Sequence, residues 1–234
     1  MRQKRSGGAR GLGRVLVLGA TSGIGRALVL ALRSRGYEAV AAGRRRALLE
    51  TLGGETLELD VTAPDAVTRI AAVRADTVVF NAGFGERSLV PDARRTAQAL
   101  AVNVLAFERV AQWALTNCAC FAVTSSIAGI RGLEGTNGYS ASKAYQICAM
   151  EGYRRTVRFG GGGCRIVTIL PGFVDTAMGQ ASTFWRCSPE TAACCILEGL
   201  ERGVPVIYVT GRWRWMAWLM RGIPRAWFER IRLT

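Results

Sequence analysis

The 234-residue sequence predicts a single α/β domain, a doubly wound parallel sheet with helices on both faces. Short apolar runs of strand length alternate with stretches of helical periodicity along most of the chain. Half of the residues are apolar, which is enough for one sizeable core. We find no internal repeat and no linker that would divide this core between two domains.

The expected elements follow one another as strand, helix, strand. Strands are predicted at 14–18, 38–42, 56–60, 76–80, 120–124, 164–170 and 205–209. Helices are predicted at 25–34, from about 64, and at 92–100, 102–116, 139–159 and 189–202. Ser188 is the expected N-cap of the last helix, because a serine followed by Pro189 is a common helix start.

Three regions are expected along the chain. Residues 1–13 are basic and glycine-rich and lack the apolar stretch of a secretory signal, so they are predicted to form a flexible tail. Residues 14–210 carry the alternating strands and helices. Residues 211–234 form an extension rich in Trp and Arg, which Gly222 and Pro224 divide into two short helices.

Composition excludes several classes of function. The net charge is +14, but the arginines are spread along the chain, so we expect a solvated surface rather than a nucleic-acid site. No apolar run reaches the length of a membrane span. The chain has no histidine, and its seven cysteines show no zinc spacing, so no metal site is expected. Such cysteines are typical of core residues in the reducing cytoplasm.

A glycine-rich motif follows the first strand and opens the first helix. Residues 19–25 read GATSGIG, and glycines at this position allow backbone N–H groups to approach a pyrophosphate. The alternative is an ordinary glycine-rich turn. The position of the motif at the start of a β-α series favours a dinucleotide site on a Rossmann sheet. The predicted contacts are Gly19, Thr21, Ser22, Gly23, Ile24 and Gly25.

The end of the second strand indicates which dinucleotide is bound. It carries Arg44 and Arg45 and no carboxylate, and arginine matches a 2′-phosphate whereas an acidic residue would bind the free ribose. We therefore expect NADP(H) to be preferred, with NAD(H) as the alternative; Arg46 is equally compatible with the start of a solvated helix. The ends of the third and fourth strands add Asp60, Val61, Asn81, Ala82 and Gly83 to the predicted cofactor site.

A tyrosine and a lysine mark the expected chemical centre. Only two of the 31 cationic residues are lysines, and one of them, Lys143, lies one helical turn after Tyr139. A nearby ammonium stabilises a phenolate, which brings the pKa of a tyrosine closer to neutral pH. Ser126, after the strand at 120–124, is placed to hold a carbonyl near this tyrosine.

With these motifs on the page, the chain resembles the short-chain dehydrogenase/reductase family over residues 14–209. The shared signatures are GATSGIG, Asp60-Val61, Asn81-Ala-Gly83, Asn103, Ser126, Tyr139-x-x-x-Lys143 and the segment from Pro171 to Thr176. The resemblance implies an oxidoreductase that transfers hydride between a nicotinamide and a carbonyl or alcohol substrate, and commonly a homodimer or homotetramer.

The resemblance also implies a role for each matched residue. Tyr139 would be the proton donor, Lys143 would lower its pKa and bind the nicotinamide ribose, and Ser126 would polarise the carbonyl. Asn103 would steady a water chain between Lys143 and bulk solvent. The nicotinamide carboxamide would be held by Pro171, Gly172, Val174 and Thr176.

Substrate recognition and the C-terminal extension are less determined. Phe84, Phe184 and Trp185 are candidate walls of the substrate pocket. The four tryptophans and six arginines of residues 212–234 are compatible with a peripheral membrane contact, with packing on the protein's own core or substrate entrance, or with a subunit interface. Two alternatives to a reductase also stay open, a non-catalytic nucleotide-binding regulator and an epimerase or dehydratase.

Overall fold

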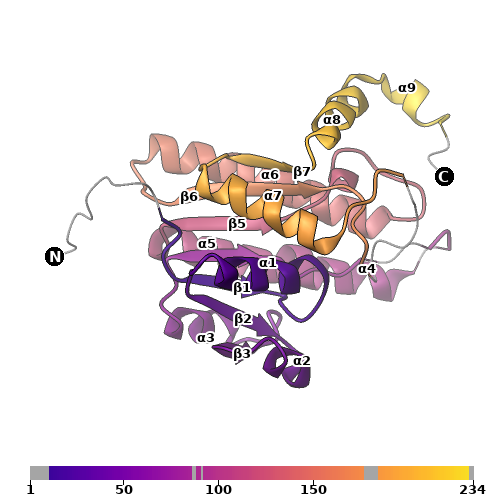
Figure 1. Ribbon diagram of the computed structural model, residues 1–234. Helices are drawn as coiled ribbons and strands as arrows, with labels where there is room; N and C mark the ends of the chain where they lie inside the picture. Colours follow the sequence, from indigo (N-terminus) through magenta and orange to yellow (C-terminus); the bar gives the residue numbers. More distant parts are fainter. Residues whose placement is uncertain (1–10, 86–87, 91, 177–183, 232–234) are drawn as a thin grey trace.

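The structure is a computed structural model that describes residues 11–85, 88–90, 92–176 and 184–231. A single parallel sheet of seven strands has the order β3-β2-β1-β4-β5-β6-β7 (Figure 1). The order changes direction between β1 and β4, which is the place where open α/β sheets bind ligands. The strands are β1 (Val15–Leu18), β2 (Ala39–Gly43), β3 (Thr56–Glu58), β4 (Thr77–Phe80), β5 (Cys120–Thr124), β6 (Arg165–Pro171) and β7 (Val206–Val209).

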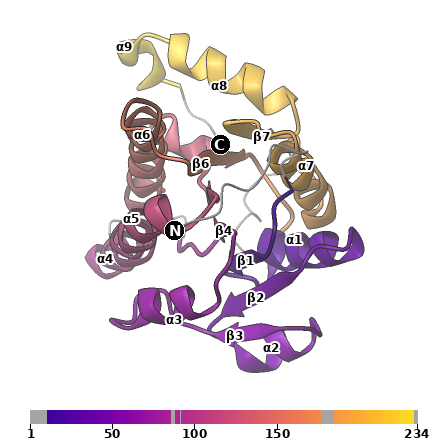
Figure 2. The same cartoon turned by 90° about the vertical axis from the view of Figure 1, so that its left-hand side faces the viewer.

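Helices cover both faces of this sheet. Figure 2 shows α1 (Gly23–Ser34) and α7 (Pro189–Glu201) on one face. The opposite face carries α3 (Ala66–Ala72), α4 (Ala93–Leu100), α5 (Phe107–Asn117) and α6 (Asn137–Phe159), and the short α2 (Arg46–Glu50) lies beside β3. The predicted doubly wound fold is confirmed.

Two apolar layers hold the helices on the sheet. Leu28, Leu32 and Ile196 pack on one face. Phe107 fills the other, with its ring 5.8 Å from that of Phe80. All four residues of β1 and all four of β4, the two strands beside the glycine motif, are buried, as central parallel strands require. The motif is therefore presented by a rigid support.

Several boundaries differ from the sequence prediction. Leu12, which the sequence prediction placed in the tail 1–13, is buried, and its carbonyl accepts a hydrogen bond from Thr77 Oγ1. Residues 1–10 of the predicted tail lie outside the described residues. The helices predicted at 92–100 and 102–116 are joined without a break by a π-helical segment, Ala101–Ala106. Helix α2 begins at Arg46, in agreement with the alternative that this arginine starts a solvated helix; its extent was not predicted, because five residues carry too little periodicity.

The C-terminal extension forms the two predicted helices, α8 (Arg212–Gly222) and α9 (Arg225–Phe228). They follow β7 and lie beyond this edge of the sheet (Figure 1). Trp213, Ala217 and Met220 pack there against Leu170 and Ile127. Ser188 is the N-cap of α7, as predicted, and accepts a hydrogen bond from the Thr191 backbone at 3.1 Å. Among the described residues, no helix has the length and apolar character to cross a bilayer.

Candidate active site

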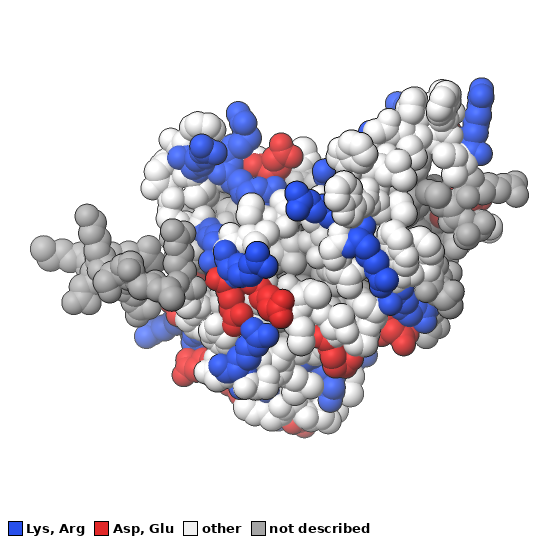
Figure 3. Space-filling model, turned by 45° about the horizontal axis from the view of Figure 1, so that its top comes forward, with Lys and Arg blue, Asp and Glu red and all other residues white. Residues whose placement is uncertain are grey.

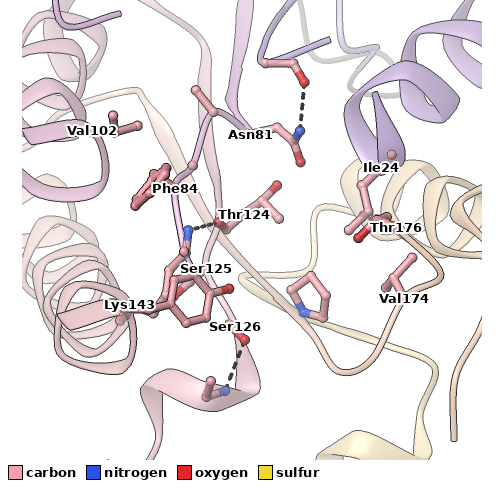
Figure 4. A pocket seen from close by; sticks show the side chains of 18 of the residues that line it. Ile24, Asn81, Phe84, Val102, Thr124, Ser125, Ser126, Lys143, Val174 and Thr176 are labelled. Carbon is pink, nitrogen blue, oxygen red and sulfur yellow. Dashed lines mark hydrogen bonds between the residues drawn. The ribbon is translucent and has the colours of Figure 1, made fainter. Parts of the chain in front are cut away.

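A cavity of about 920 Å³ opens at the carboxyl ends of β1 to β6 (Figure 4). Of the predicted site residues, it is lined by Gly19, Thr21, Ser22, Gly23, Ile24, Arg44, Arg45, Asp60, Val61, Asn81, Ala82, Gly83, Phe84, Ser126, Tyr139, Lys143, Pro171, Gly172, Val174, Thr176 and Phe184. Three predicted residues, Gly25, Asn103 and Trp185, do not line it. The fold thus gathers residues from six strand ends into one place.

The glycine motif makes a tight turn between β1 and α1. A Cβ on Gly25 would lie 2.2 Å from the Gly19 carbonyl oxygen, and one on Gly19 would lie 2.7 Å from the backbone of Ala82, so neither position accepts a side chain. Helix α1 begins at Gly23, and in this part of the described structure no side chain caps it. Its first N–H groups and the positive end of its dipole are therefore available to an anion.

Arginine lies over this turn from the end of β2. Arg45 donates to Thr21 Oγ1 from Nη2 at 2.7 Å and to Ser22 Oγ at 2.9 Å. Arg44 lies 3.9 Å from Asp60. Burial raises the pKa of Asp60, but hydrogen bonds from Thr62 and the charge of Arg44 outweigh it, so that the pKa lies below its ordinary value. This end of the cavity combines guanidinium groups with an uncapped helix, which suits a phosphorylated ligand.

Asn81 fixes the opposite side of the turn. Its Nδ2 donates to the Gly19 carbonyl at 3.1 Å, a bond drawn in Figure 4. Gly83 follows, and a Cβ there would meet Asn103 Oδ1 and Lys143 Nζ only at 3.5 Å. The loop after β4 therefore connects the phosphate end of the cavity with its chemical end.

Ser126 and Tyr139 lie together at the chemical end. Ser126 is the N-cap of a short 3₁₀ helix, Ile127–Gly129, and accepts from the Ala128 backbone at 3.1 Å. Burial raises the pKa of Tyr139 above its ordinary value, while a hydrogen bond with Ser126 lowers it. A Cβ on Gly85 would lie 2.2 Å from the Tyr139 ring, so the glycine backbone packs against the ring.

Lys143 lies beneath this tyrosine with 3% of its surface exposed. Its ammonium donates to the Thr124 carbonyl at 2.8 Å and to Gln146 Oε1 at 3.1 Å, and lies 5.8 Å from the centre of the Tyr139 ring. Burial lowers the pKa of Lys143 to about 7. Burial thus acts on both groups, and its effect on Tyr139 is opposite to the lowering of the Tyr139 pKa that the family resemblance implies for Lys143.

Asn103 lies in the π-helical segment and is fully buried. Its Oδ1 accepts from the Phe84 backbone N–H at 2.9 Å, and its Nδ2 donates to the Phe84 carbonyl at 2.7 Å and to Ser142 Oγ at 2.9 Å. Ser142 in turn donates to the Tyr139 carbonyl at 2.7 Å. Asn103 therefore supports the loop and helix that carry the reactive side chains, from outside the cavity.

The segment after β6 completes the cofactor side. Val174 forms an isolated β-bridge with Cys187, and Thr176 packs beside Gly23, since a Cβ on that glycine would lie 2.8 Å from Thr176 Cγ2. Residues 177–183 of the expected substrate lid lie outside the described residues. Phe84 and Phe184 line the cavity, as predicted.

Trp185 corrects the predicted substrate pocket. Instead of lining the cavity, it stacks behind Phe184 at 4.6 Å and contacts Trp213 at 5.7 Å. The missing wall comes from α8, through Trp213, Met216 and Met220. This agrees with one of the alternatives for the extension, packing on the core or at the substrate entrance. The three residues were not named from the sequence, because an extension beyond the last strand has no fixed position relative to the sheet; their spacing on one helical face was the available signal.

A doubly wound sheet with a glycine-rich turn and with Ser126, Tyr139 and Lys143 in one cavity is the arrangement expected of a dinucleotide-dependent oxidoreductase. The family model described as short chain dehydrogenase matches residues 13–186. A relative from Myxococcus xanthus described as an uncharacterized oxidoreductase is 37% identical over 203 residues, covering 72% of this chain and 75% of its own length. The chain belongs to the short-chain dehydrogenase family.

Two solved structures show the same fold. A short chain dehydrogenase from Burkholderia cenocepacia in complex with NADP has a TM-score of 0.81 and 25% identity, with 95% of this chain and 98% of that chain covered. A short chain dehydrogenase/reductase from Burkholderia phymatum in complex with NAD has a TM-score of 0.78 and 20% identity, with 88% and 92% covered.

Proposed function

We propose that this protein is an NADP(H)-dependent ketoreductase or alcohol dehydrogenase. The observation that carries this proposal is the pair Ser126 and Tyr139 in the lining of one cavity, with the buried Lys143 Nζ 5.8 Å from the Tyr139 ring and with Arg44 and Arg45 at the other end of the cavity. Such a pair places a proton donor and a carbonyl-binding hydroxyl side by side.

The cofactor site fits a dinucleotide. The backbone turn that a Cβ at Gly19 or Gly25 would fill, the start of α1 and Arg45 are arranged for a pyrophosphate and a further phosphate. NADP in the Burkholderia cenocepacia structure and NAD in that from Burkholderia phymatum support a nicotinamide dinucleotide, and the two arginines favour NADP(H). When bound, the nicotinamide supplies the hydride.

The chain's own residues would handle the substrate oxygen. Ser126 Oγ would orient and polarise the carbonyl, and the Tyr139 hydroxyl would transfer its proton to the oxygen as hydride reaches the carbon. Oxidation of an alcohol reverses both transfers. Lys143 would hold the ribose side and stabilise the tyrosinate when protonated. Phe84, Phe184, Trp213 and Met216 give the substrate end an apolar lining, which suits a hydrophobic carbonyl compound.

The test is Tyr139→Phe, assayed by NADPH absorbance against a graded panel of carbonyl compounds and repeated with NADH. We expect kcat to fall by at least about 10²-fold, the usual worth of a general acid, while NADPH still binds. A variant that kept most of its rate would show that Tyr139 is not the proton donor. Absence of turnover with bound NADPH in the wild type would favour the regulator, and turnover without release of NADP⁺ would favour the epimerase or dehydratase.

We also propose that the outward face of α8 contacts an anionic membrane surface. Trp213 of α8 is buried against the cavity wall, whereas Trp215 and Trp218 are 73% and 72% exposed on the opposite face, with Leu219 beside them. The same helix carries Arg212, Arg214 and Arg221 and no acidic residue. Aromatic rings flanked by arginines suit lipid headgroups.

A second copy of the chain is a poorer partner for this face. In a symmetric interface, the face would meet itself, and the arginines of α8 would oppose their own copies without acidic partners on the helix. Glu229 on the neighbouring α9 is already paired with Arg225 at 2.9 Å. A homodimer or homotetramer built on other surfaces, and a cytoplasmic location, remain predictions.

A further inference from the structure

Gln146 bridges the two residues that the family resemblance connects through water. It lies on α6 about one turn after Lys143 and is fully buried. Its Oε1 accepts from Lys143 Nζ at 3.1 Å, and its Nε2 donates to the main-chain carbonyl of Asn103 at 2.8 Å. The carboxamide therefore occupies the direct path between the lysine and Asn103.

The orientation of this carboxamide is determined by its neighbours. An ammonium only donates hydrogen bonds and a backbone carbonyl only accepts them, so Oε1 must face Lys143 and Nε2 must face Asn103. A water molecule in this place would donate and accept and could reorient, whereas a neutral amide does not pass a proton from its oxygen to its nitrogen side. The Gln146 carboxamide therefore fixes the position of the Lys143 side chain but does not transfer a proton.

The remaining groups around Asn103 are also occupied by protein. Its side-chain amide is bound to the Phe84 backbone and to Ser142, and Ser142 reaches the Tyr139 carbonyl. On the other side, Ser125 Oγ donates to the Lys143 carbonyl at 2.9 Å. These bonds leave the cavity as the side from which solvent reaches Tyr139 and Lys143.

We propose that Gln146 is a positioning residue, whose carboxamide holds the Lys143 ammonium beneath Tyr139 and closes the route along Asn103 by which water would exchange protons with that lysine. The role in proton supply rests on the proposed reductase function. After Tyr139 has given its proton to the substrate oxygen, the tyrosinate takes the next proton from the cavity side. With glutamine at position 146, Lys143 acts through its charge and its hydrogen bonds and does not relay protons from solvent.

The surroundings of Lys143 make its titration a direct measure of this bridge. Tyr139 is the titratable side chain that faces the ammonium from α6. The elements packed around it present the Thr124 carbonyl from β5, Gly83 from the loop after β4 and Asn103 from the π-helical segment, none of which titrates. Burial is the cause of the low pKa of about 7, and Gln146 contributes an uncharged acceptor.

The sequence allows this titration to be read without a substrate. The chain contains two lysines, Lys4 and Lys143, so protein labelled with [13Cε]lysine gives two side-chain signals, which Lys4→Arg assigns. Gln146→Met keeps the length of the side chain and removes both hydrogen bonds. Gln146→Glu adds a negative charge beside the ammonium. The matched control is Gln112→Ala, because Gln112 is exposed on α5 and donates to Glu108 at 3.3 Å, on an element other than the one that carries Lys143.

We expect Gln146→Met to lower the midpoint of the Lys143 titration by about one pH unit, because the charged form loses an acceptor, and Gln146→Glu to raise it by at least as much. The control should leave it unchanged. An unchanged midpoint in Gln146→Met would overturn the proposal. If circular dichroism shows that Gln146→Met does not fold, Gln146→Glu tests the proposal instead, and an unchanged Lys143 midpoint in that variant would overturn it.

Turnover separates this inference from the proposed function. In an active enzyme, Gln146→Met should lower kcat/KM by about tenfold to 100-fold and move the limb of its pH profile with the Lys143 midpoint. If Gln146 only filled space, Gln146→Met would keep its kcat/KM, and the limb of the pH profile would stay at the same pH. If no carbonyl compound is reduced by the wild type, the proposed function fails, while the titration still decides the role of Gln146 toward Lys143.

Discussion

Arg45 connects the phosphate-binding turn with the choice of cofactor. Its guanidinium is held by Thr21 and Ser22, so it is oriented before any ligand arrives, and an oriented guanidinium loses less entropy when it binds a phosphate. Arg46, the next residue, instead pairs with Glu50 at 2.9 Å and lies outside the cavity lining. Two adjacent arginines therefore have different expected roles.

This difference predicts the effect of removing each arginine. Arg45→Ala should weaken NADPH binding by about tenfold to 100-fold, the worth of a hydrogen bond to a charged group, and should leave NADH binding nearly unchanged. Arg46→Ala is the control and should affect neither. Fluorescence titration of both dinucleotides measures the effect. Equal weakening of NADPH and NADH by Arg45→Ala would instead assign Arg45 to the support of the turn.

The residues that sequence alone predicted are those defined by local order along the chain. The glycine turn, Ser126, Tyr139 and Lys143 each follow directly from a strand end or a helical spacing, and the structure brings them to one cavity. Gln146 was not found, because its meaning depends on the backbone carbonyl of Asn103, which approaches only through tertiary packing. The burial of Tyr139, which raises its pKa, was also not visible in the spacing of the sequence.

At the scale of elements, α8 is held from its inner face and from its end. A Cβ on Gly172 would lie 1.9 Å from the Trp213 ring, so the indole rests directly on the backbone after β6. Arg131 donates to the Met220 carbonyl at 3.0 Å and to that of Ile223, which satisfies carbonyls at the C-terminus of the helix. Its guanidinium lies 5.0 Å from the Phe228 ring of α9.

Two tryptophans of α8 should therefore differ in their effect on stability. Trp213 is 4% exposed, and Trp213→Ala should lower the free energy of unfolding by about 3–5 kcal/mol, as for other large aromatic residues removed from a core. Trp215 lies on the outward face, and Trp215→Ala should change it by less than about 0.5 kcal/mol. Urea denaturation followed by circular dichroism gives both values. Similar losses in the two variants would contradict this packing of α8.

Element types were predictable wherever the periodicity was long. The strands repeat the predicted ranges within one or two residues because buried parallel strands are nearly all apolar. The π-helical segment was not predictable, since its sequence, Ala101–Ala106, has ordinary helical composition and the wider turn depends on packing. The position of α8 beside the cavity was not predictable for the same reason, because it also depends on tertiary packing.

At the scale of the whole molecule, the high net charge is distributed rather than concentrated. Figure 3 shows arginine and lysine side chains at separate places on one face, with acidic side chains among several of them. Arg14, for example, pairs with Glu38 and Glu55, and Arg35 pairs with Glu201. The outward face of α8 differs, because it exposes Trp215 and Trp218, and the helix carries three arginines and no acidic residue.

This contrast leads to a test of the proposed contact between the outward face of α8 and an anionic membrane. The protein should sediment with vesicles of phosphatidylcholine that contain about 30% phosphatidylglycerol, and much less with phosphatidylcholine alone, because the arginines need anionic headgroups. Raising NaCl to about 0.5 M should weaken the binding by screening. Replacing Trp215 and Trp218 together by alanine should weaken it by at least about tenfold, since two buried rings are lost.

Phe159 provides the matched control for that double variant. It is 75% exposed near the C-terminus of α6, with the guanidinium groups of Arg155 and Arg158 within 5.7 and 5.9 Å of its ring. Phe159→Ala should leave vesicle binding unchanged, because a single ring adds little apolar area beside the pair on α8. If neither variant loses vesicle binding while NaCl still weakens it, binding follows the overall charge of +14 instead, because both variants keep that charge. Failure to bind vesicles, with a dimer in light scattering that Trp215→Ala and Trp218→Ala dissociate, would assign the face to a second copy of the chain.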